Sequence, residues 1–221
     1  MKTIIATLLL TAAVTTTFAQ TLYTNTVTTT SGQAIPDNDS SGVVGTANFS
    51  GLQNVSSISV SLSLAGGYNG DLYAYLVSPT GGFSVLLNRV GVSAANASGY
   101  ADAGFNITLS DSATANIHNY QGGSYSLSGG SLIGTWAADG RNISPLSTGT
   151  VFDTAPVNAG LSTLVGSDPN GQWVLFLADL SSGGTTTLTS WSLTLVTVPE
   201  PGMLALLGLG LAGIVARRMR R

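Results

Sequence analysis

The stretch Ser57–Gly66, SISVSLSLAG, decides the fold of this chain. Large aliphatic residues alternate with serines along it, and successive side chains of an extended strand point to opposite faces. The apolar positions are Ile58, Val60, Leu62 and Leu64. A period of two with one apolar face and one hydroxyl face predicts a half-buried β-strand.

Further strand patterns follow along the chain, with turn residues between them. The predicted strands cover Leu72–Val77, Phe83–Leu87, Phe105–Leu109, Trp173–Asp179 and Trp191–Leu195. The Trp173–Asp179 run is almost continuously apolar, which is typical of a strand covered on both faces. Glycine, asparagine and proline in GGYNGD, SPTGG and DPNGQ supply the reversals. The pattern predicts an all-β fold, either a β-sandwich or a jelly roll.

Two segments of the body are less regular. Residues 20–32 are expected to form a flexible or edge-strand lead-in, and residues 116–156 to form loops that carry one or two short strands.

Charged residues are scarce and mostly acidic. They make up 8% of the chain, and residues 20–198 contain nine aspartates, two arginines and no lysine, a net charge of minus seven. Such a body lacks the basic surface that nucleic-acid binding needs, so nucleic acid is excluded as a partner. The absence of cysteine excludes disulfides and thiol chemistry.

The first 19 residues, MKTIIATLLLTAAVTTTFA, have the pattern of a signal peptide. Lys2 precedes an apolar run, and small residues lead to Ala19. We expect signal peptidase to cut between Ala19 and Gln20, which implies export. The alternative is a buried N-terminal helix.

The last residues, VPEPGMLALLGLGLAGIVARRMRR, contain a marginal membrane segment. The apolar run at 203–216 would form a short helix of roughly 21 Å, against about 30 Å of hydrocarbon. Two prolines stop the helix from extending backwards. A basic cluster closes the chain and is expected to hold the end in the cytoplasm: Arg217, Arg218, Arg220 and Arg221. The alternative is a permanent single-span anchor.

This tail resembles the PEP-CTERM sorting signal of Gram-negative bacteria. The motif Val198, Pro199, Glu200 and Pro201 stands before the apolar helix and the arginines, in the order that the signal requires. The resemblance implies a precursor that inserts transiently into the inner membrane. An exosortase would cut it near Pro199–Pro201 and release the body to the cell surface or an exopolysaccharide matrix.

The body resembles the P domain, or P/Homo B domain, that accompanies subtilisin-like proprotein convertases. The matching pieces stand in family order at residues 35–43 (IPDNDSSGV), 68–82 (YNGDLYAYLVSPTGG), 86–91 (LLNRVG), 168–179 (DPNGQWVLFLAD) and 188–195 (LTSWSLTL). The resemblance covers residues 33–196 and implies an all-β, jelly-roll-like antiparallel β-sandwich there, and the family often carries calcium. Asp71 and Asp179 match its recurrent acidic positions.

No residue is predicted to be catalytic. The single histidine, His118, falls in a predicted loop, where we expect it to be exposed or locally hydrogen-bonded, and no Gly-x-Ser-x-Gly motif presents a serine. We therefore expect a non-catalytic adhesive or binding module, with surface polysaccharide as a partner. The alternative is a secreted hydrolase, either a protease or a glycosidase that pairs two carboxylates.

Calcium is the one cofactor that the sequence suggests. It takes six to eight oxygen ligands, which exported sandwiches gather from several loops. The predicted ligands are Asp71 and Asp179, with Asp37 and Asp39 as additions. Turn capping by these aspartates is the alternative.

Overall fold

The computed structural model describes the backbone of residues 21–197 and the side chains of residues 32–197. The predicted signal peptide with its Ala19–Gln20 cleavage site lies outside these residues. So do the sorting motif at 198–201, the apolar helix at 203–216 and the arginines at 217–221. Within residues 21–197, no helix combines the length and the hydrophobicity needed to cross a membrane.

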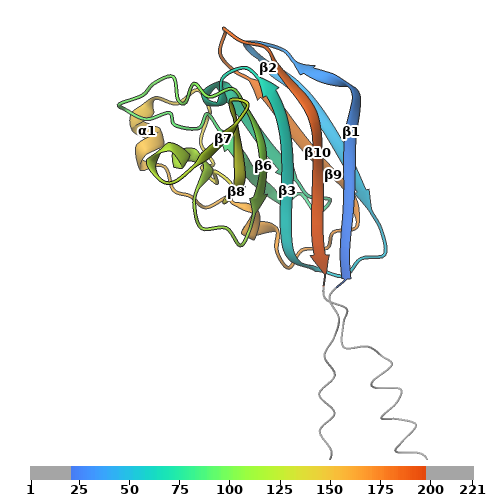
Figure 1. Cartoon of the computed structure of the whole chain (residues 1–221). Coiled ribbons are helices and arrows are strands. Elements are labelled where there is room, and N and C mark those ends of the chain that lie inside the picture. The colour runs from blue at the N-terminus through green and yellow to red at the C-terminus, as the bar shows by residue number, and fades with distance from the viewer. Residues whose placement is uncertain (1–20, 198–221) are drawn as a thin grey trace, which may run out of the picture. The chain divides into compact units, whose positions relative to one another are not determined.

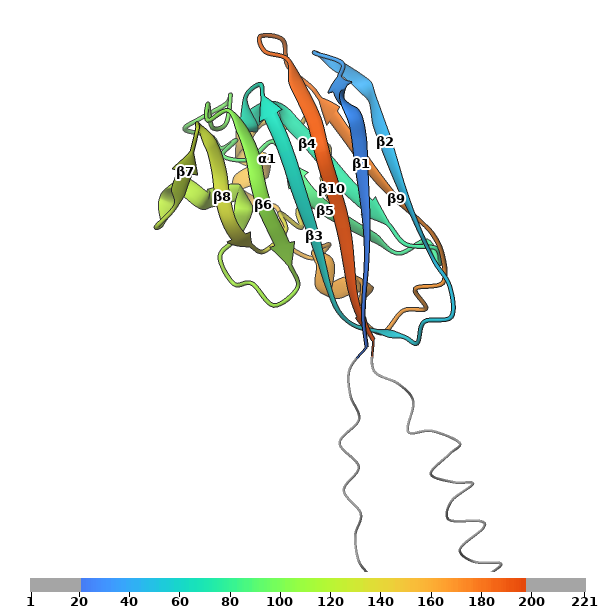
Figure 2. The same ribbon diagram turned by 45° about the vertical axis from the view of Figure 1, so that its right-hand side comes forward.

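Two β-sheets pack face to face, which confirms the all-β sandwich (Figures 1 and 2). The six-stranded sheet contains, in spatial order, β1 (Thr21–Ile35), β10 (Thr186–Thr197), β3 (Val55–Gly66), β6 (Gly104–Ser110), β8 (Ser131–Trp136) and β7 (Ser126–Ser128). The four-stranded sheet contains β2 (Asp39–Phe49), β9 (Gly171–Asp179), β4 (Leu72–Val77) and β5 (Phe83–Asn88). Short helices connect some strands: η1 (Asn69–Asp71), η2 (Ile117–Gly122), α1 (Gly149–Thr154) and η3 (Leu161–Leu164).

The alternating stretch that predicted the fold lies in β3, between β10 and β6. Its aliphatic side chains are buried between the sheets, whereas its serines are partly exposed on the other face. The hydroxyl of Ser61 pairs across the sheet with that of Thr108 at 3.0 Å. The period of two therefore corresponds to burial on one face, as predicted.

One strand pair departs from the predicted antiparallel arrangement. Strands β6 and β8 run parallel, with Phe105 opposite Leu132 and Leu109 opposite Trp136. A parallel pair needs a long crossover connection, and the segment between the two strands, which contains η2 and β7, provides it. As expected, residues 116–156 contain two short strands, β7 and β8.

The structure corrects the prediction of a flexible lead-in at residues 20–32. Residues 21–35 form β1, an edge strand that pairs with β10 from Thr21–Thr197 to Ile35–Thr186. Threonine and valine suit an extended backbone, and β10 supplies the pairing partner that the local sequence does not reveal. The edge-strand alternative for this segment is the correct one.

Strand β9 is covered on one face along its length but not on both. Val174 and Phe176 point outward and stay partly exposed. The ring of Phe176 stacks on Tyr75 of the neighbouring strand, with centroids 4.7 Å apart and planes inclined by 18°. The apolar character of this strand therefore reflects an aromatic cluster on the outer face of the sheet rather than a second buried layer.

Two tryptophans from facing sheets anchor the core. Trp173 in β9 is fully buried and donates its indole N–H to the carbonyl of Pro169 at 2.9 Å. Trp191 in β10 is 2% exposed, and its ring lies against the backbone of Gly45 in β2, where a Cβ would overlap the indole. The sequence did not predict β2 because such glycines interrupt its apolar alternation.

Candidate binding cleft and its buried support

A cleft of about 320 Å³ opens at the end of the four-stranded sheet where β4 begins and β5 ends. Its lining includes Tyr68, Asp71, Arg89, Tyr100 and Ser181, together with small residues from the loop that precedes β6. Binding pockets for small ligands start at roughly 300 Å³, so the cleft is large enough for a short ligand.

The helical turn η1 places Asp71 in the cleft. The amide of Gly70 donates to the carbonyl of Tyr100 at 2.8 Å, and a Cβ at Gly70 would overlap the backbone of Ser98 and Gly99. Glycine is therefore required for this close approach. Asp71 follows at once and is only 7% exposed. Burial raises the pKa of Asp71, while a hydrogen bond from Ser181 and the charge of Arg89 oppose that rise.

Arg89 has a left-handed backbone, with φ of 47°. This conformation costs a residue with a Cβ roughly 1–2 kcal/mol. The amide of Arg89 donates to the carbonyl of Leu72 at 2.8 Å. Its Nε donates to the carbonyl of Gly70 at 3.2 Å, and its Nη2 to the hydroxyl of Ser181 at 3.4 Å. The strained backbone accompanies a side chain that reaches over η1 to the cleft.

Arg89 is also the one base that is not buried among residues 32–197. The only other arginine there, Arg141, is buried against Asp139. A body with nine aspartates thus places its single accessible positive charge in this cleft.

Two tyrosines form the walls of the cleft. Tyr68 is 44% exposed. Tyr100 packs edge-on against Tyr120, with ring centroids 4.6 Å apart, and a Cβ at Gly91 would overlap the Tyr100 ring. The hydroxyl of Tyr120 donates to Asp102 at 2.7 Å, and burial strongly raises the pKa of Tyr120. At neutral pH Tyr120 is therefore a phenol that holds Tyr100 in place.

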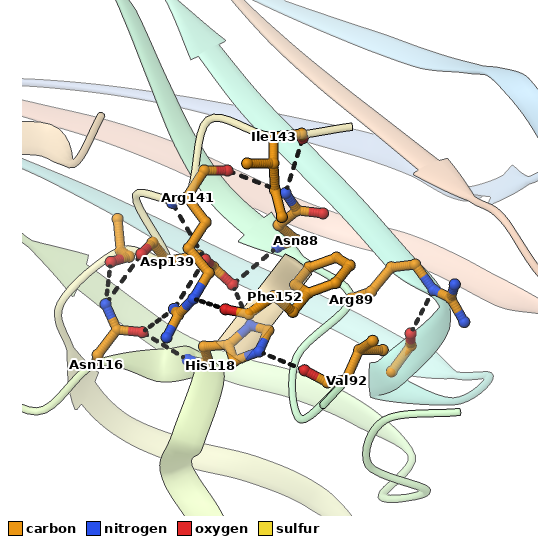
Figure 3. A network of polar contacts seen from close by, with 11 residues as sticks. Asn88, Arg89, Val92, Asn116, His118, Asp139, Arg141, Ile143 and Phe152 are labelled. Carbon is orange, nitrogen blue, oxygen red and sulfur yellow. Dashed lines mark hydrogen bonds and ion pairs between the residues drawn. The ribbon is translucent and has the colours of Figure 1, made fainter. Parts of the chain in front are cut away.

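A buried polar network lies beside the cleft (Figure 3). The carboxylate of Asp139 is fully buried and accepts hydrogen bonds on both oxygens. Its Oδ2 lies 2.7 Å from Nδ1 of His118 and accepts from the amide of Asn88 at 3.2 Å. Its Oδ1 accepts from Nη1 of Arg141 at 3.2 Å and from the Arg141 amide at 3.3 Å. The ring of Phe152 stacks on His118 at 5.5 Å.

This network holds both ends of the segment that carries Arg89. Asp139 binds the amide of Asn88, on one side of Arg89. On the other side, Nε2 of His118 lies 3.0 Å from the carbonyl oxygen of Val92, and the His118 carbonyl accepts from the amide of Gly91 at 2.8 Å. The strained residue is thus fixed between two buried anchor points, which positions its guanidinium.

The structure corrects the prediction for His118. The residue lies in η2 rather than in a loop, and it is 3% exposed. Its partners Asp139 and Val92 are distant in sequence, so no local pattern revealed them. The Val92 carbonyl faces Nε2, the nitrogen that a catalytic triad turns toward its serine.

The four predicted calcium ligands are gathered at one end of the sandwich, but they behave differently. Asp179 pairs in register with Asp39 on β2 and with Leu72, the neighbour of Asp71, on β4. Burial raises the pKa of Asp179, and the negative charges of Asp71 and Asp37 add to the rise. Asp39 instead accepts a hydrogen bond from the Ser41 amide at 2.8 Å, which lowers its pKa. It therefore caps its own turn.

These aspartates do not form a ready calcium cage. Asp179 accepts from the hydroxyl of Thr186 at 3.1 Å, and Asp37 from the amide of Gly183 at 3.4 Å. Within residues 21–197, no three acidic, histidine or cysteine side chains are close enough together to hold a metal ion. Calcium needs six to eight oxygens, so its binding here stays a prediction.

Sequence reasoning did not single out Arg89, Tyr68 or Tyr100 as functional residues. Arg89 did carry a signal, because an isolated arginine in a lysine-free body stands out. The two tyrosines lie in glycine-rich loops and had no distinguishing pattern. They reach one cleft only through the packing of η1 and η2.

Comparison with known proteins identifies the tail. Residues 197–221 match the model of the PEP-CTERM protein-sorting motif. This match supports an exported protein that is sorted by exosortase in a Gram-negative bacterium, with a membrane-anchored precursor. A search of curated proteins gives no match.

Two solved structures show a distant likeness. One is a serine protease of Aeromonas sobria in complex with its chaperone, and the other is the serine protease of Aeromonas sobria. Both have 18% sequence identity and a TM-score of 0.43, and they cover 84% and 82% of this chain. The chain spans only 28% and 27% of the length of those chains. The P-domain resemblance of the body stays a prediction.

Proposed function

We propose that this protein is a non-catalytic surface adhesion module of P-domain type that binds polysaccharide through the cleft around Asp71 and Arg89. The observation that carries the proposal is the convergence of Arg89, the only accessible arginine of residues 32–197, with a buried carboxylate and two tyrosines in one cleft. Pockets with a few convergent polar groups and aromatic walls are the usual form of small-ligand sites.

The composition of the lining supports a sugar-containing partner. Tyrosine rings offer apolar faces to the C–H surfaces of a sugar, while their hydroxyls remain hydrated. The carboxylate of Asp71 accepts hydrogen bonds and the guanidinium of Arg89 donates them, as hydroxyl groups require. The cleft is too small for a folded partner to enter.

The same cleft argues for binding without catalysis. Asp71 is the only carboxylate among its lining residues, whereas glycoside hydrolysis generally uses a pair. The histidine is buried and engaged with Asp139 and Val92. On this basis we favour binding over the hydrolase alternative.

The tail completes the proposal. We propose that exosortase cuts near Pro199–Pro201 and that the body then reaches the cell surface or the exopolysaccharide matrix. Mass spectrometry of the protein from the surface of its host tests this step. The expected result is a C-terminus near residue 200. Recovery of surface material that is intact through Arg221 would contradict cleavage.

Co-sedimentation tests the binding step. The full chain in detergent is mixed with insoluble exopolysaccharide from its host, and the bound fraction is measured. Tyr68→Ala is expected to lower the bound fraction several-fold. Leu146→Ala is the control, because Leu146 is 73% exposed and does not line the cleft. Equal binding by the wild-type chain and Tyr68→Ala would refute the cleft as the site.

A further inference from the structure

We propose that the cleft recognises a neutral sugar through two adjacent hydroxyl groups held by Asp71 and Arg89. This inference rests on the proposed function and names the ligand class of the same site. Asp71 lies directly before β4 and Arg89 directly after β5. Because these neighbouring strands are antiparallel, both residues stand at the same end of the sheet, and they meet in the lining of one cleft.

A hydroxyl of the protein already lies beside this pair. The Ser181 hydroxyl accepts a hydrogen bond from Nη2 of Arg89 at 3.4 Å and lines the cleft together with Asp71, whose pKa it lowers. An alcohol can donate and accept at once, so one hydroxyl satisfies both partners. Two adjacent hydroxyls of a sugar can do the same beside Ser181, with one donating to Asp71 and the other accepting from Arg89.

The charge of the lining favours a neutral ligand. Asp71 and Arg89 are its only charged residues, so the lining has no net charge. Just outside the lining, the negative charge of Asp37 contributes to the raised pKa values of both Asp71 and Asp179. An anionic sugar would gain contact with Arg89 but would be repelled by these carboxylates.

The conformation of Arg89 indicates that its side chain is used. Glycine adopts positive φ without penalty, so Arg89→Gly would relieve strain at this position. Arginine in this place lowers stability while it directs a guanidinium into the cleft. Arg89→Gly should therefore fold stably but no longer bind the sugar.

The test is calorimetric titration of the full chain in detergent. The probes are neutral trisaccharides of mannose, galactose and glucose, a 3-deoxy analogue of the best of them, and trigalacturonic acid as the anionic comparator. We expect at least one neutral probe to bind, with the deoxy analogue and the acid at least tenfold weaker.

Variants complete the test. Asp71→Asn and Arg89→Gly should each weaken the neutral sugar at least tenfold, and Arg89→Gly should keep or raise the melting temperature. Arg89→Lys should bind the sugar little better than Arg89→Gly does, because an ammonium lacks the paired N–H groups of a guanidinium. The control variant Leu146→Ala should bind as the wild-type chain does.

The outcomes separate this inference from the proposed function. If trigalacturonic acid bound more tightly than the neutral trisaccharides and this binding were lost in Arg89→Gly, the inference of a neutral ligand would be wrong. The cleft would still be the binding site. Exopolysaccharide binding that depends on Tyr68 but not on Asp71 or Arg89 would also overturn it. Neutral-sugar binding that is unchanged in both variants would refute the pair as the recognition element.

Discussion

Nδ1 of His118 lies 2.7 Å from Oδ2 of Asp139, and both side chains are buried. Asp139 also holds the buried guanidinium of Arg141 and the amide beside Arg89. The pair thus connects the interior of the domain to the position of the cleft arginine.

Loss of the Asp139 charge should destabilise the whole domain. Asp139→Asn leaves Arg141 buried without its counter-ion, and breaking a buried pair costs about 3–5 kcal/mol. Urea denaturation of the full chain measures the change. Asp153→Asn is the control, because Asp153 is exposed and accepts one hydrogen bond, from the Ala94 amide. Equal stability of the two variants would contradict the structural role of the network.

Gly45 should not tolerate a methyl group. A Cβ there overlaps the Trp191 indole, and overpacking of a core costs about 1–3 kcal/mol. The Trp191 N–H has no hydrogen-bond partner, so Trp191→Phe removes an unsatisfied donor together with part of the bulk. Thermal unfolding should show that Gly45→Ala costs less in the Trp191→Phe background. Gly122→Ala should be nearly neutral, because its Cβ would meet no atom within 4 Å.

The buried aspartates predict a pH dependence of stability. Burial raises the folded-state pKa values of Asp71 and Asp179 above 3.8, so the folded state holds protons that the unfolded state releases. This stabilising contribution is fully present at pH values below the pKa of the unfolded state. It is lost as the pH rises through the pKa values of the folded state. The rise in melting temperature caused by Asp71→Asn should therefore be larger at pH 7 than at pH 4.

The pKa of Asp39 is shifted in the opposite direction, so Asp39 serves as the comparison. Its pKa is lowered by the hydrogen bond from the Ser41 amide, so its contribution is present above the unfolded value and is lost as the pH falls. Asp39→Asn should then destabilise the protein slightly at pH 7 and less at pH 4. A matching pH trend for Asp71→Asn and Asp39→Asn would contradict the assigned environments.

The predicted calcium site has its own test. Calcium that binds the folded state raises the melting temperature by mass action. Binding at the predicted ligands would give a rise with millimolar calcium, reversal by a chelator, and loss of the rise in Asp71→Asn and Asp179→Asn. A melting temperature that does not move with calcium would remove the metal from this end of the sandwich.

Several features were predictable because their causes are local. Alternation in Ser57–Gly66 requires only that one face of a strand is buried, and β3 has that pattern. The sorting motif at the tail is read from contiguous residues, and residues 197–221 match it. Strand β2 was not predicted, because Gly45 is explained only by the tryptophan that faces it from the other sheet.

The sequence by itself determined that this chain forms a β-sandwich and ends in a sorting signal, because periodicity and motifs act over neighbouring residues. Only the tertiary structure decided that His118 is buried on Asp139 and that Asp71, Arg89 and Tyr100 line one cleft. Sheet pairing and loop packing bring together residues that are remote in the chain. The strained backbone of Arg89 likewise depends on contacts from η1 and η2, which no local pattern of LLNRVG contains.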